Sequence, residues 1–171
     1  MLAWHFLNND GTLRKGGLKV TPGMTLRMRG KLVMCERGFH YSLRALDALQ
    51  YAPGAMVSRV DVAGEIIPGT DKGVASQRTH LWIADATNTL HEFACWCAEN
   101  ALNLLRAKGQ EPDPRAWAAI EAKRKWLRGE ISDTELAAAR GAAGAAARAA
   151  ARDAQNAQLE TMLLALEPVN S

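Results

Sequence analysis

The sequence predicts an α+β fold: a small mixed, mainly antiparallel sheet with two helices, followed by a C-terminal helical hairpin with a long Ala-rich helix. Short runs of alternating apolar and polar residues in the first half predict strands that bury one face. From Thr87 onward the apolar residues recur every three or four positions, which is the period of a helix. Thirteen alanines between Ala137 and Ala157 strengthen the helical prediction, because alanine is the strongest helix former.

The first expected elements are short strands. Leu2–Leu7 is a strand candidate, and the turn sequence Asn8-Asn9-Asp10-Gly11 closes it. Thr25–Arg29 and Lys31–Cys35 flank Gly30, and we expect them to pair as a tight antiparallel hairpin.

A short helix and a long strand follow. Ser42 is expected to cap a helix that runs through Tyr51 and ends at Pro53-Gly54. Met56–Ile67 alternates apolar with charged residues, which predicts a strand, and Gly64 marks a bulge within it.

One more strand precedes the helical part. Thr79, Leu81 and Ile83 form a period-two run, and the helical pattern that begins at Thr87 ends at Gly109. The first module is therefore expected to span residues 1–109.

The linker 110–114 separates that module from a helical hairpin over residues 115–171. Asp113 is placed to cap the first helix, with Pro114 at its first position, and this helix ends near Arg128. Ser132 and Glu135 form a capping box that starts the Ala-rich helix. We expect that helix to reach about Leu166, and two helices joined by a short break to fold back on each other.

Charge and cysteine content limit the function classes. Residues 1–50 carry eight Lys or Arg and three Asp or Glu, an excess below that of a strong nucleic-acid binder. The three cysteines are expected to be free thiols in a reducing compartment. The sequence starts without a signal-peptide pattern and contains no membrane-length apolar run, so we expect a cytoplasmic protein of the host bacterial cytosol that contacts no membrane.

Three residues invite a metal interpretation. His91 and Cys95 share a helical face, but Cys97 lies about 200° around the helix from Cys95. Structural zinc sites need a fourth ligand and favour a different cysteine spacing, whereas buried apolar thiols are common. We therefore expect no metal and no cofactor.

The densest run of functional side chains is the octapeptide from Cys35 to Ser42. A nucleophile formed by Cys35 and His40 is conceivable if the two meet in space. Since no third, orienting residue is identifiable, we favour an interpretation as a turn in which Gly38 supplies a positive φ, and we assign no catalytic residue.

Basic and aromatic side chains are the candidates for partner binding. The front module offers cations near its strands, and the hairpin offers Trp126 in a basic setting and an arginine stripe on the Ala-rich helix. The candidate partner-binding residues are Arg27, Arg29, Lys31, Lys123, Arg124, Trp126, Arg140, Arg148 and Arg152. Arginines grip acidic side chains well, so the expected partner is a host protein or complex with an acidic surface.

Residues 35–79 resemble a family of uncharacterised proteins encoded by phages and bacterial genomes. The resemblance lies in the motifs CERGFHYS, LDALQYAPG, RVDVAGEI and DKGVA, and many relatives carry Ala/Arg-rich tails that end in a segment similar to residues 155–160. It implies a phage-derived protein and brings no catalytic residues.

The turn Gly38-Phe39-His40-Tyr41-Ser42 is also similar to a turn in ADP-ribosyltransferase-like folds. This resemblance implies an alternative nucleotide site, for NAD for example, formed by Gly38, His40, Tyr41, Ser42 and Glu65. His5 would take the place of the first-strand residue of those folds.

The leading functional hypothesis is a non-enzymatic binding protein that occupies a surface of its host partner, as anti-CRISPR inhibitors of bacterial defence do. The first alternative is an ADP-ribosyltransferase-like enzyme that binds a nucleotide. The second is a nucleic-acid-binding accessory protein that uses the basic residues from Arg14 to Arg44. A homodimer through the C-terminal helix is a further expectation, because its alanines and glycines allow close approach.

Overall fold

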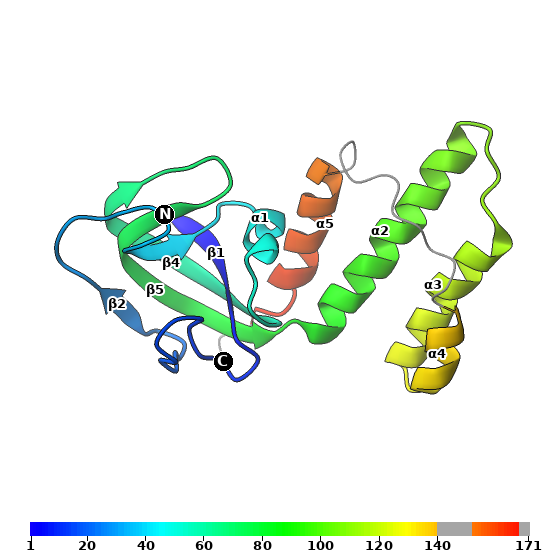
Figure 1. Cartoon of the computed structure of the whole chain (residues 1–171), viewed down its shortest axis with the longest axis horizontal. Helices are drawn as coiled ribbons and strands as arrows, with labels where there is room; N and C mark the ends of the chain where they lie inside the picture. Colours follow the sequence, from blue (N-terminus) through cyan, green and yellow to red (C-terminus); the bar gives the residue numbers. More distant parts are fainter. Residues whose placement is uncertain (140–151, 168–171) are drawn as a thin grey trace. The chain divides into compact units, whose positions relative to one another are not determined.

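The computed structural model describes residues 1–139 and 152–167, which form a five-stranded antiparallel sheet and five helices (Figure 1). The strands are β1 (Leu2–Leu7), β2 (Thr25–Arg27), β3 (Phe39–Tyr41), β4 (Met56–Ile67) and β5 (Gly73–Asp85). The helices are α1 (Ala45–Gln50), α2 (Thr87–Ala107), α3 (Pro114–Leu127), α4 (Asp133–Ala139) and α5 (Arg152–Leu164). The predicted α+β class is confirmed.

Two compact units make up the fold. The first comprises Met1–Thr87 together with the segment that starts at Asn156, and the second is Asn88–Gln155. These bounds differ from the expected modules 1–109 and 115–171, since α2 is grouped with α3 and α4 and most of α5 is grouped with the sheet. Residues 140–151 of the expected Ala-rich helix lie outside the described residues.

The hairpin of β4 and β5 is the centre of the sheet, whose strand order is β1-β4-β5-β2, with β3 also paired to β5. The register shifts between Ala63 and Ile66, where Gly64 adopts a φ of +77°. This shift confirms the predicted bulge. A Cβ at position 64 would lie 2.2 Å from Ser76 Oγ, which is why the bulge carries a glycine. The core on the sheet consists of Ala3, Tyr41, Val60, Val62 and Ala75, with Ile66 packed against them.

The expected hairpin around Gly30 does not form. Thr25 pairs with Thr79 of β5, and the residues from Lys31 to Cys35 form no strand. The 13 residues of β5 offer unpaired backbone groups to both β2 and β3, and pairing with a central strand satisfies more of them than an isolated two-stranded hairpin.

Ser42 does not cap α1, contrary to the sequence prediction. Its backbone pairs with Trp4 instead, through N–H···O bonds of 2.8 and 3.1 Å. The first free N–H groups of α1 donate to side chains of α5: Ala45 to Glu160 Oε1 at 3.0 Å, and Leu46 to Asn156 Oδ1 at 2.8 Å. A segment more than 100 residues away in sequence thus replaces the local cap.

The second unit follows the local rules closely. Asp113 caps α3 by accepting the N–H of Arg115 at 2.8 Å, and Pro114 is the first helical residue. Ser132 and Glu135 form the predicted capping box of α4, with the Ser132 N–H donating to Glu135 Oε2 at 2.8 Å. Along the described parts of the chain, we find no helix with the length and apolar character needed to cross a membrane.

Candidate functional site

A cavity of about 370 Å³ opens in the first unit, beside β1, β3 and β5. Its apolar walls include Trp4, Phe6, Leu13 and Phe39. A volume of this size is within the range of small-molecule sites, which is roughly 300–1,000 Å³.

The charged groups around the cavity are mostly cationic. Arg14, Lys15, Lys72 and Arg78 line it, against one carboxylate, that of Glu36. Four cations against one lining carboxylate create a positive potential, which attracts anions. Asp71, which accepts the Tyr51 hydroxyl and lies beside Lys72, offsets part of this potential.

Arg78 is the buried member of this group, with 2% of its surface exposed. Its Nη1 donates to the carbonyl oxygen of His40 at 2.7 Å, and its guanidinium lies 5.6 Å from the ring centre of Phe39. Its Nε is buried without a hydrogen-bond partner, and within residues 1–139 and 152–167 no carboxylate pairs with it. Burial lowers the pKa of Arg78 to about 9, so it remains charged at neutral pH.

Three histidines near Arg78 are held neutral. Burial lowers the pKa of His80 to about 3, with Arg78 adding repulsion, and it also lowers the pKa values of His5 and His40. His80 Nδ1 lies 2.8 Å from Ser58 Oγ, and His40 Nε2 accepts the backbone N–H of Cys35 at 3.0 Å.

The structure brings together four of the five residues predicted for a nucleotide site. Gly38, His40, Tyr41 and Ser42 all line the cavity. Glu65 does not: it lies at the exposed bulge of β4, where its N–H donates to Ser76 Oγ.

Gly38 has the positive φ expected of it, +133°, and a Cβ there would lie 2.0 Å from Val74 Cγ2. Cys35 and His40 are also neighbours, although the contact joins the Cys35 backbone to the ring. Sequence reasoning missed two lining residues of the cavity, Lys72 and Arg78. Arg78 lies on strand β5, and Lys72 lies in the turn just before it.

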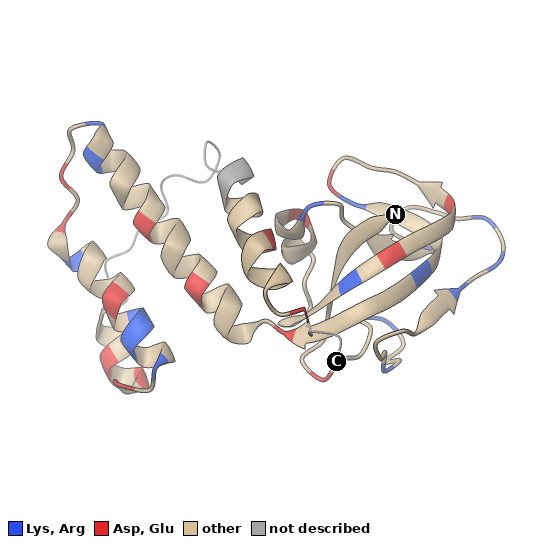
Figure 2. Ribbon diagram, turned by 180° about the vertical axis from the view of Figure 1, so that it is seen from behind, with Lys and Arg blue, Asp and Glu red and all other residues tan. Residues whose placement is uncertain are grey.

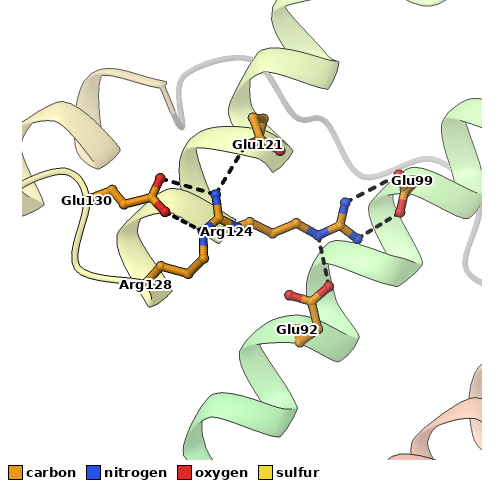
Figure 3. Close-up of polar contacts among 6 residues, drawn as sticks. All are labelled: Glu92, Glu99, Glu121, Arg124, Arg128 and Glu130. Atoms are coloured by element: carbon orange, nitrogen blue, oxygen red, sulfur yellow. Dashed lines mark hydrogen bonds and ion pairs between the residues drawn. The ribbon is translucent and has the colours of Figure 1, made fainter.

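The predicted partner-binding residues on α3 are engaged within the second unit. Arg124 bridges α3 to α2, with Nε 2.8 Å from Glu92 Oε1 and Nη2 2.8 Å from Glu99 Oε2 (Figure 3). Hydrogen bonds to these carboxylates raise the pKa of Arg124, and the bond from Arg124 lowers the pKa of Glu99. Arg128 pairs with Glu121 and Glu130 (Figure 3).

Trp126 is similarly occupied. Its Nε1 donates to Asp133 Oδ1 at 2.6 Å, and Lys123 Nζ lies 3.6 Å from its ring centre. The ring of His91 meets it edge-on at 5.6 Å. Arg140 and Arg148 lie outside the described residues, as does the side chain of Arg152.

The predicted cations of the front unit are exposed. Arg27, at the end of β2, donates from Nε to Gln77 Oε1 at 3.0 Å, and Arg29 and Lys31 follow on the next loop. In the described ranges, no carboxylate forms an ion pair with these three residues. Figure 2 shows the blue Lys and Arg positions along β2 and this loop.

The candidate metal ligands do not form a centre. Across the described residues, no group of three or more His, Cys, Asp or Glu side chains is arranged to hold a metal ion. Cys95 is buried, and burial raises the pKa of Cys97 to about 11. Both thiols are therefore protonated at neutral pH, a form that binds metals poorly.

Family comparisons divide the chain near the end of β5. Residues 1–92 match the family described as "Domain of unknown function (DUF7666)", and residues 81–166 match the family described as "Imm-5 like putative immunity protein". The first match contains the sheet and every residue that lines the cavity. Searches of curated proteins and of solved structures returned no match.

Proposed function

The chain belongs to the DUF7666 family through residues 1–92 and to the Imm-5-like immunity proteins through residues 81–166, and we propose from this that it protects a cell by binding a toxic protein. The immunity match is the observation that carries the proposal. We therefore propose that the partner is a toxic protein and not a CRISPR complex.

The polar chemistry of the second unit supports binding over catalysis there. Among its described residues, several charged side chains form internal pairs, such as Arg124 with Glu92 and Glu99, and Arg106 with Glu111. An active site instead needs acids or bases that are free to exchange protons with a substrate. Ion pairs that join α2 to α3 hold the helices in one arrangement, and a preorganised surface loses less entropy when it binds.

Cations that lack acidic neighbours suggest the chemistry of the partner. Arg27, Arg29 and Lys31 are exposed and unpaired with carboxylates in the described chain. The immunity match contains a second set of cations, Arg140, Arg148 and Arg152. We propose that both sets face an acidic surface, which raises the association rate and makes binding weaker at high salt.

The test begins with capture of a partner by the tagged full chain from the cells in which it occurs. Expression of the captured protein alone should stop growth of a bacterial host, and co-expression of this chain should restore it. A captured protein that binds tightly but is harmless when expressed alone would show that the immunity role is wrong.

Charge reversals then test the acidic surface. Arg27→Glu/Arg29→Glu and Arg148→Glu/Arg152→Glu should each weaken partner binding at least tenfold, mainly through slower association. Lys108→Glu, at an exposed position after α2, is the control for net charge and should leave binding unchanged. If both double variants bind normally, the partner is recognised by other chemistry. A gel shift with duplex DNA that equals the partner's affinity would favour the nucleic-acid alternative.

A further inference from the structure

The cavity in the first unit contains an unsatisfied cation that the proposed immunity role does not use. Arg78 has 2% of its surface exposed, and its Nε has no hydrogen-bond partner. A buried charge is normally paired, because removing it from water is costly. Within residues 1–139 and 152–167, no carboxylate forms an ion pair with Arg78.

We propose that this cavity binds a small organic anion, whose carboxylate or phosphate group pairs with Arg78 and whose apolar body lies against Phe39 and Leu13. A guanidinium presents five N–H donors in a planar fork that matches both kinds of oxyanion. The His40 carbonyl uses one N–H of Nη1, and the partnerless Nε is shielded from solvent, so the remaining N–H groups of the two terminal nitrogens are the donors for a ligand.

The other polar groups around the cavity also favour an anion. Lys72 and Lys15 add positive charge at the lining, where Glu36 is the single carboxylate. Burial lowers the pKa of His40, so its ring is neutral, and its Nε2 accepts the Cys35 N–H. Among the lining residues, a cationic ligand would meet repulsion from four cations and attraction from one carboxylate.

The apolar residues that line the cavity indicate the chemistry of the uncharged part of the ligand. Phe39 and Leu13, which are partly exposed, supply aromatic and apolar surface at the lining, and a bare inorganic anion would leave it uncovered. A volume of about 370 Å³ accommodates a ring in addition to the acidic group. The ligand class is thus an aromatic or otherwise flat carboxylic acid or phosphate monoester.

Titration calorimetry of the full chain with phenyl phosphate, benzoate and inorganic phosphate tests this inference. One aromatic anion should bind at one site per chain with a millimolar or lower Kd, and inorganic phosphate should bind at least tenfold more weakly. Tighter binding of phenyl phosphate than of benzoate assigns a phosphate ligand, and the reverse order assigns a carboxylate. The inference fails if neither aromatic anion binds.

Arg78→Met removes the charge and keeps most of the volume. We expect at least a tenfold loss of affinity for the aromatic anion, with a melting temperature equal to or above that of the unchanged protein, because a buried unpaired charge has been removed. Lys108→Met, at an exposed position outside the cavity, also removes one positive charge and is the control that should bind the aromatic anion normally. Unchanged affinity in Arg78→Met would overturn the inference.

A second variant covers the case in which Arg78→Met does not fold. Lys15→Glu/Lys72→Glu reverses charge at the lining without removing a buried side chain, and it should also weaken binding of the aromatic anion at least tenfold. Equal affinity in this variant would likewise overturn the inference. Arg78→Met changes a buried side chain and should leave capture of the protein partner unchanged, so failure of this site and failure of the immunity role are distinguishable.

Discussion

At the scale of single residues, β5 buries two polar side chains on one face. Arg78 and His80, two residues apart, are each at most 2% exposed, whereas Leu81 is 42% exposed. A register shift separates them from Trp82, which pairs with Arg59 and packs against Trp4. The run of Thr79, Leu81 and Ile83 correctly indicated a strand, but the residues between them face the interior. Hydropathy alone points to the opposite face, because a buried arginine and histidine are exceptions to the usual pattern.

These buried histidines make the stability of the protein depend on pH. An unfolded histidine has a pKa of about 6.5, whereas burial lowers the pKa of folded His80 to about 3 and lowers that of His5 as well. Between these values the unfolded state binds more protons, so the free energy of unfolding falls as the pH is lowered from about 6.5 towards 3. We expect the urea midpoint to be lower at pH 5 than at pH 7.5.

The control for this prediction compares a titrating with a non-titrating side chain. His80→Gln removes the buried titrating group and should reduce the difference between the midpoints at the two pH values. Asn103→Gln, at an exposed position on α2, replaces no titrating group and should leave that difference intact. A urea midpoint that is the same at pH 5 and pH 7.5 in the unchanged protein would contradict the assignment.

At the scale of elements, the contrast is between caps made locally and a cap made at a distance. Asp113 and the Ser132–Glu135 box lie within three residues of the groups they satisfy, so their sequence patterns identified them. The cap of α1 comes from Asn156 and Glu160. A six-residue helix is too short to be stable alone, and its formation therefore depends on α5.

Removal of the distant caps should destabilise the first unit. Asn156→Ala and Glu160→Ala should each lower the free energy of unfolding by about 1 kcal/mol, the usual effect of deleting a helix N-cap. Gln158→Ala, on the same helix and with no bond to α1 among the described contacts, should change it by less than half as much. Chemical denaturation followed by far-UV circular dichroism measures all three. Equal effects of the three substitutions would mean that α5 stabilises the unit by packing alone.

At the scale of the whole molecule, the first unit consists of two segments of the chain, and the second unit lies between them in sequence. Leu159 and Leu163 of α5 are fully buried, and the segment from Asn156 belongs with the sheet. The two family matches overlap only at residues 81–92, so the second family's region supplies a helix that completes the unit of the first.

This arrangement predicts the outcome of a truncation. A chain that ends at residue 109, the expected module boundary, keeps the sheet but loses α5 and both caps of α1. We expect it to melt at a lower temperature than the full chain and to expose apolar surface to a dye such as ANS. A chain that ends at residue 167 is the control and should melt like the full protein. Equal melting of the 109-residue chain would show that the first 109 residues form an independent domain.

The sequence by itself determined the features that depend on neighbours along the chain. The strands at Leu2–Leu7 and Met56–Ile67, the bulge at Gly64 and the caps of α3 and α4 follow from periodicity and from contacts within a few residues. The segment from Gly38 to Ser42 was recognised as a candidate site because its functional side chains are consecutive, although it forms strand β3 against β5 and not the predicted turn.

Tertiary structure alone decided the pairing of β2 with β5, the capping of α1 by α5 and the position of Arg78 at the lining of the cavity. Each depends on groups 38 to 115 residues apart that the fold brings within hydrogen-bonding distance. The sequence around Arg78 did not identify it as a site residue, because what distinguishes it is burial without a paired carboxylate. Which charges lie near a buried side chain depends on the packing of strands that are distant in sequence.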